Sequence, residues 1–263
     1  MKDSIKGILP GMFTMGNLAC GFGAIIICTQ AKSLPPELIE HSLREATWLV
    51  ILAAFFDFLD GLVARFSKTY SRFGVELDSL TDLVSFGVAP AVIIVSFSLI
   101  SNGTWALILA FVYLMAGSFR LARFNLTAIL EQKVNFVGLP IPSAAIVIIS
   151  FILFSFELWG DIKIEKFFII LIVATSALMV STIEFEVMPR FDFTKVKNRV
   201  KVGILFIFAI GVMWNASLVI FPLVALYILY GVARLLISIF IGNGKYGPER
   251  VLTAAHDNKE KKD

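Results

Sequence analysis

The chain has 263 residues, of which 58% are hydrophobic, and its mean hydropathy is +0.85. This apolar fraction is above the roughly 45–50% of soluble domains. The apolar runs are continuous rather than alternating, which favours membrane-spanning helices over a barrel. The net charge is only +3, and we expect membrane lipid rather than nucleic acid as a partner.

Eight apolar runs predict membrane helices, because a helix needs about 20 residues to cross the bilayer. The runs cover residues 11–30, 46–66, 76–101, 104–126, 141–157, 166–183, 200–214 and 216–240. One helix over the last two runs would be about 60 Å long, twice the bilayer core, so we expect a break near Asn215. The sequence predicts an all-α, polytopic transmembrane bundle over residues 1–241, followed by a polar cytoplasmic tail over 242–263.

The basic residues predict the orientation of this bundle. With the N-terminus in the cytoplasm, the Lys and Arg residues fall on the cytoplasmic side, except Lys32, Arg44, Lys163 and Lys166. An excess of Lys and Arg marks the cytoplasmic side of a membrane protein. We therefore expect an even number of helices and two cytoplasmic termini.

Four aspartates interrupt the second and third apolar runs. Asp57 and Asp60 are three residues apart, and Asp78 and Asp82 are four apart, so each pair shares one helical face. The connection between the two helices is short, which makes them antiparallel neighbours whose carboxylates can converge. A charge at the bilayer centre costs roughly 2.5–3.5 kcal/mol, and a bound cation would offset that cost.

Carboxylate ligands with no His or Cys nearby favour a hard cation, and we expect one or two Mg²⁺ or Mn²⁺ ions. Such ions usually share their coordination shell with substrate phosphates. Asp57 lies eight residues before Arg65, which is about 12 Å along a helix. This places Asp57 near the depth of the lipid head groups on the cytoplasmic side of the membrane. These residues indicate metal-assisted phosphoryl-type transfer on a lipid-linked phosphate. An ion-coupled transporter is the alternative, because buried acids also carry H⁺ or Na⁺.

The segment from Asp57 to Asp82 resembles the signature of the CDP-alcohol phosphotransferase family, D-x2-D-G-x2-A-R-x8-G-x3-D-x3-D. It matches at every fixed position: Asp57, Asp60, Gly61, Ala64, Arg65, Gly74, Asp78 and Asp82. Members move a substituted phosphate group from a CDP-linked donor to an alcohol and release CMP. The resemblance implies a catalytic core over about residues 10–185.

The resemblance also implies a role for each matching side chain. Metal ligation falls to four carboxylates: Asp57, Asp60, Asp78 and Asp82. Asp82 is also implied as the general base. The cytidine and phosphate pocket is implied to contain Thr14, Gly61, Ala64, Arg65 and Gly74. One departure concerns Gly11, which stands where many relatives carry an Asn that contacts the nucleotide.

Three further stretches resemble the branch of this family that uses CDP-diacylglycerol and L-serine. They are GNLACGF at 16–22, FRLARFN at 119–125 and FVGLPIPSAA at 136–145. Arg binds carboxylates bidentately, and the expected serine contacts are Arg120, Arg123, Asn17 and Asn125. Both arginines could instead be basic residues that extend to the cytoplasmic surface.

Glycerol 3-phosphate and inositol phosphate remain alternative acceptors. We expect a homodimer in the cell (inner) membrane, with the active site facing the cytoplasm.

Overall fold

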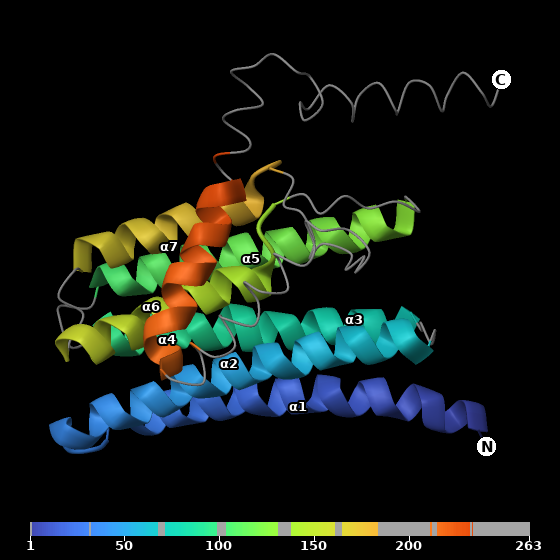
Figure 1. Cartoon of the computed structure of the whole chain (residues 1–263), viewed down its shortest axis with the longest axis horizontal. Coiled ribbons are helices and arrows are strands. Elements are labelled where there is room, and N and C mark those ends of the chain that lie inside the picture. The colour runs from blue at the N-terminus through green and yellow to red at the C-terminus, as the bar shows by residue number, and fades with distance from the viewer. Residues whose placement is uncertain are drawn as a thin grey trace, which may run out of the picture.

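The computed structural model describes residues 2–31, 33–67, 72–98, 104–130, 138–160, 165–183, 211, 215–231 and 233. Over these residues the regular structure is entirely helical (Figure 1). The helices are α1 (Lys2–Ala31), α2 (Pro36–Ser67), α3 (Arg72–Asp82), the π-helix η1 (Leu83–Val88), α4 (Ala89–Ser98), α5 (Thr104–Leu130), α6 (Ile141–Trp159) and α7 (Glu165–Val180). A further apolar helix covers Asn215–Gly231.

Within the described part of the chain, five helical segments are long and apolar enough to cross a membrane. They are Gly11–Ala31, Leu38–Ala64, Phe73–Phe97, Trp105–Leu126 and Ile141–Trp159. The all-helical, integral-membrane prediction is thereby confirmed. The sixth predicted span corresponds to α7, which has only 16 residues, and the seventh, 200–214, lies outside the described residues except for Gly211. The count of eight spans therefore stays a prediction.

Helix α2 begins at Pro36, whereas the apolar run predicted a start at residue 46. Proline is tolerated in the first turn of a helix, where its missing N–H has no partner to lose. The next turns carry charged pairs four residues apart, with Arg44 Nε 3.6 Å from Glu40 Oε1 and His41 Nδ1 3.4 Å from Glu45 Oε1. Such pairs stabilise a helix that extends beyond its apolar segment, so the predicted boundary was wrong.

Helices α1 and α2 lie side by side along one edge of the bundle (Figure 1), and α3 packs against α1. Helix α6 supplies much of the core, where Ile148, Ile149 and Ile152 are fully buried. Small buried side chains such as Ala24 on α1 and Ala53 on α2 allow these two helices to approach closely. This packing places α3 against α1.

Helices α3, η1 and α4 form one continuous run, and the π-helical turn in it lies just before Pro90. In η1 the N–H of Ala89 donates to the carbonyl of Val84, five residues back. Pro90 has no N–H, so the carbonyl of Phe86 loses its α-helical partner. The hydroxyl of Tyr113 on α5 donates to that carbonyl over 2.7 Å. The irregular turn is thus completed by a side chain from another helix.

Asn215, Glu157 and Arg44 form a polar cluster that connects the Asn215–Gly231 helix to α6, away from the aspartates. Asn215 Nδ2 donates to Glu157 Oε1 over 3.0 Å, and Arg44 Nη2 lies 3.9 Å from Glu157 Oε2. Asn215 Oδ1 also accepts from the N–H of Leu218 over 3.3 Å, as an N-cap does. The Phe221 ring packs on α6 with its centroid 5.1 Å from that of Phe151.

Replacing Tyr113 by Phe tests the contribution of the bond to η1. The variant removes one hydroxyl and leaves the buried Phe86 carbonyl unpaired, which costs about 1–3 kcal/mol. We expect a melting temperature several degrees lower, measured on purified protein in detergent. Tyr230→Phe is the matched control, because the Tyr230 side chain is 64% exposed and its loss of a hydroxyl should change little. Equal melting temperatures for Tyr113→Phe and the wild type would contradict the assignment.

Candidate active site

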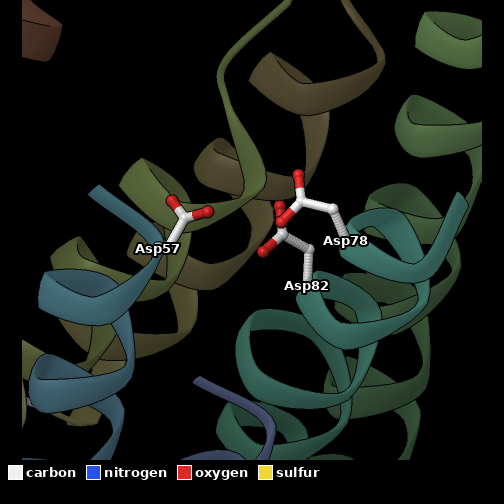
Figure 2. Close-up of side chains that lie close together, drawn as sticks. All are labelled: Asp57, Asp78 and Asp82. Atoms are coloured by element: carbon white, nitrogen blue, oxygen red, sulfur yellow. The ribbon is translucent and has the colours of Figure 1, made fainter. Parts of the chain in front are cut away.

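Three of the four aspartates meet between α2 and α3 (Figure 2). Asp57 reaches across from α2 toward Asp78 and Asp82, which project from successive turns of α3. One carboxylate oxygen of each residue lies within 4.8 Å of the other two. This is the only group of three or more potential metal ligands within the described ranges.

The chemistry of this carboxylate group fits a hard divalent cation. All three side chains are partly buried, and Asp78 Oδ1 is buried with no hydrogen-bond partner among the described residues. Unpaired negative charges that lie close together in an apolar bundle repel one another strongly. Carboxylate oxygens at this spacing are the ligands that Mg²⁺ and Mn²⁺ prefer. Asp57, Asp78 and Asp82 are therefore the residues that could hold a metal here.

Asp60 lies beside this group rather than within it. Its side chain is 7% exposed, and its Oδ2 accepts a hydrogen bond from Thr14 Oγ1 on α1. Its charge still acts on both Asp57 and Asp78. The contact between Thr14 and Asp60 connects two residues for which the family resemblance implies separate roles, nucleotide contact and metal ligand. Both roles stay predictions.

Apart from Thr14 on α1, the residues predicted for the nucleotide lie in the last turns of α2 and the first turn of α3. A Cβ built on Gly61 would meet no atom within 4 Å, so the space beside it is open. Ala64 and Gly74 are partly buried, in the last turns of α2 and the first turn of α3. Arg65 belongs to α2, but its side chain lies outside the described part of the structure. Nucleotide binding by these residues remains a prediction.

Arg120 on α5 is a buried cation that interacts electrostatically with the carboxylate group. Its side chain is only 5% exposed, and its charge interacts with that of Asp82. The guanidinium carbon lies 6.0 Å from the centroid of the Phe124 ring. Nε of Arg120 has no hydrogen-bond partner among the described residues. A buried Arg with an unused donor, whose charge acts on Asp82, can bind an anion.

The other predicted serine contacts are engaged with the protein. Arg123 donates to three carbonyl oxygens at the end of α7, at 3.4 Å to Met179, 3.1 Å to Val180 and 3.0 Å to Ser181. A cationic side chain stabilises the carbonyl end of a helix. Asn125 Oδ1 accepts from Ser79 Oγ over 3.2 Å. Arg123 and Asn125 thus connect α5 to α7 and to α3, and their serine contacts stay predictions.

Asn17, the fourth predicted serine contact, lies directly against the site. Its Nδ2 donates to Asp82 Oδ1 over 3.3 Å. No role was predicted for Ser79 or Ser85, whose hydroxyls donate to Asn125 Oδ1 and to the carbonyl of Asn17. Their positions in the sequence could have suggested such a role. Each is a hydroxyl residue within three positions of Asp78 or Asp82 on an apolar helix.

Comparison with known proteins gives a match to the CDP-alcohol phosphatidyltransferase family over residues 7–183. The CDP-diacylglycerol–serine O-phosphatidyltransferase of Helicobacter pylori is 30% identical over 243 residues, covering 90% of this chain and 96% of the relative. The Bacillus subtilis protein of that name is 36% identical, over 54% of this chain and 75% of its own length. The archaetidylserine synthase of Methanothermobacter thermautotrophicus is 36% identical over 70% of each chain. The signature carried by α2 and α3 and the match over most of the bundle together show that this chain belongs to the CDP-alcohol phosphatidyltransferase family.

Proposed function

We propose that this chain is an enzyme that transfers the phosphatidyl group of CDP-diacylglycerol to the hydroxyl of L-serine, giving phosphatidylserine and CMP. The main support is the group of three converging carboxylates in a member of this family. The acceptor follows from relatives that are named for serine and are matched over nearly their whole length.

The reaction is a direct displacement at phosphorus. The serine hydroxyl oxygen forms a bond to the phosphorus that carries diacylglycerol, and the bond from that phosphorus to the CMP oxygen breaks. The hydroxyl proton passes to the carboxylate of Asp82, which acts as general base. Asp57, Asp60, Asp78 and Asp82 would hold one or two metal ions. When bound, Mg²⁺ or Mn²⁺ supplies positive charge that stabilises the diphosphate and the departing CMP.

The residues around the carboxylates orient the two substrates. The open space beside Gly61 accommodates part of the CDP group, next to Ala64, Arg65 and Gly74. The carboxylate of serine would be repelled by the aspartates unless a cation lay beside it. Arg120 is such a cation, and its unpaired Nε supports a bidentate contact with that carboxylate.

The membrane arrangement follows from the same chemistry. The carboxylates lie toward the end of α2 that leads into the basic SKTYSR connection. The site therefore faces the cytoplasm of the cell (inner) membrane, where a water-soluble amino acid and CMP are accessible. Eight membrane helices, two cytoplasmic termini and a homodimer complete the proposed arrangement.

Release of CMP by purified protein tests the proposal. CDP-diacylglycerol and Mn²⁺ or Mg²⁺ are supplied with serine, glycerol 3-phosphate, inositol phosphate or no acceptor. We expect release that depends on serine and stops when the metal is chelated. Release with only another acceptor would overturn the serine assignment. No release with any acceptor, from folded protein, would overturn the transferase itself.

The carboxylates can be tested one at a time. Asp57→Asn and Asp78→Asn each remove a charged metal ligand, and we expect turnover at least about 100-fold lower with weaker Mn²⁺ binding. Asp82→Asn should lower turnover by about 10²–10⁴-fold, as loss of a general base does, and retain CDP-diacylglycerol binding. Glu76→Gln is the control, an exposed carboxylate on α3. Near-normal turnover in the Asp57 and Asp78 variants would refute the metal assignment.

Arg120→Lys tests the serine contact. Lysine keeps the charge but loses the planar fork of donors. We expect the KM for serine to rise about tenfold or more, because a hydrogen bond to a charged group is lost, while the KM for CDP-diacylglycerol stays constant. Arg44→Lys, at the opposite end of α2 from the site, is the control. An unchanged KM for serine in Arg120→Lys would remove this residue from the binding site.

A further inference from the structure

The side chain of Asn17 on α1 is fully buried and contacts one carboxylate of the active site. Its Nδ2 lies 3.3 Å from Asp82 Oδ1. An ionised carboxylate only accepts hydrogen bonds, so the amide must present its NH₂ group to Asp82. Asn17 Oδ1 then points elsewhere, and it has no hydrogen-bond partner among the described residues. The amide therefore makes its one described side-chain bond to Asp82.

A second contact holds the backbone of Asn17 in place. Ser85 Oγ donates to the carbonyl oxygen of Asn17 over 3.0 Å. One turn further along α1, a Cβ built on Gly21 would lie 2.6 Å from the Cα of Ser85. Only glycine permits so close an approach of the two backbones. Helix α1 is thus fixed against η1 at the level of Asn17, independently of the Asn17 side chain.

Both contacts reach the same short stretch of chain. Asp82 is the last residue of α3, and Ser85 lies within η1, which starts at Leu83. Turns of π-helix are frequent at functional sites. The Asn17 side chain therefore donates to Asp82, the residue before the π-helical turn. The Asn17 backbone carbonyl accepts from Ser85, which lies within that turn. The backbone contact with Ser85 therefore helps to keep the side-chain amide of Asn17 next to Oδ1 of Asp82.

We propose that Asn17 is a positioning residue for Asp82: its amide holds Oδ1 and thereby sets the orientation in which the carboxylate takes the proton and faces Asp57 and Asp78. The inference rests on the proposed function and deepens it. It gives the α1 asparagine a role through Asp82, whereas the sequence suggested a direct contact with serine. Groups that orient a metal-ligating side chain typically change metal affinity or activity by about 10- to 100-fold when removed.

Asn17→Ala tests this role, because it deletes the amide and leaves the backbone carbonyl that Ser85 binds. We expect kcat to fall by about 10- to 100-fold, while the KM for CDP-diacylglycerol stays within about twofold. Asn17→Asp keeps the shape of the side chain but replaces the donor by an acceptor. It should lower kcat at least as much, and it serves as the test if the alanine variant does not fold.

Cys20→Ala is the matched control. Cys20 is buried on α1, three residues after Asn17, and has no part in the proposed chemistry. The change removes a similar small volume from the same helix, so it reports on packing alone. We expect its kcat and melting temperature to stay close to those of the wild type.

A measurement without turnover separates this inference from the proposed function. Mn²⁺ binding to the purified protein is followed by the loss of the free Mn²⁺ signal in electron paramagnetic resonance, without either substrate. We expect Asn17→Ala to weaken Mn²⁺ binding about tenfold, and Cys20→Ala to leave it unchanged. This result would support the positioning role even if serine were not the acceptor, which the CMP assay decides separately.

Two results would overturn the inference. One is wild-type kcat and Mn²⁺ affinity in either Asn17 variant, because the donor would then be dispensable. The other is equal impairment in Asn17→Ala and Cys20→Ala, since this would trace the effect to the packing of α1.

Discussion

The repulsion among carboxylates in an apolar bundle is the constraint on which the site depends. Asp57, Asp78 and Asp82 are partly buried, and one oxygen of each lies within 4.8 Å of the other two. Hydrogen-bond donors and cations must compensate, and they come from separate helices. Helix α1 supplies a hydroxyl to Asp60 and an amide to Asp82, and α5 supplies the charge of Arg120. The acids therefore determine which helices must pack around α2 and α3.

The irregular run from α3 to α4 is the second requirement of the site. Pro90 removes one backbone donor, and the chain passes through a π-helical turn before it. The lost bond is replaced by the Tyr113 hydroxyl, and the same turn presents Ser85 to the backbone of α1. An unsatisfied carbonyl inside a membrane protein would cost several kcal/mol. The contacts that stabilise this turn also connect α1 and α5 to the segment that follows Asp82.

Prediction from sequence succeeded for features that depend on local periodicity. The spacing of Asp57, Asp78 and Asp82 indicated which faces carry the acids, and the structure brings those faces together. It failed at the start of α2, because helical propensity continues past the apolar run. The π-helical turn was also not predicted from the sequence. Pro90 within a predicted span could have indicated it, because proline interrupts the backbone hydrogen bonds of a helix.

The amino-acid sequence alone determined that this protein is an α-helical membrane protein, which residues form its acidic signature, and which family that signature resembles. These properties follow from composition and from spacing within one or two helices. Tertiary structure decided the partner of each polar side chain: Thr14 for Asp60, Asn17 for Asp82, and the end of α7 for Arg123. The first two pairs are 46 and 65 residues apart in the chain. Helical periodicity fixes the face on which a side chain lies, but its partner depends on how two helices are rotated and displaced against each other, and only packing sets that.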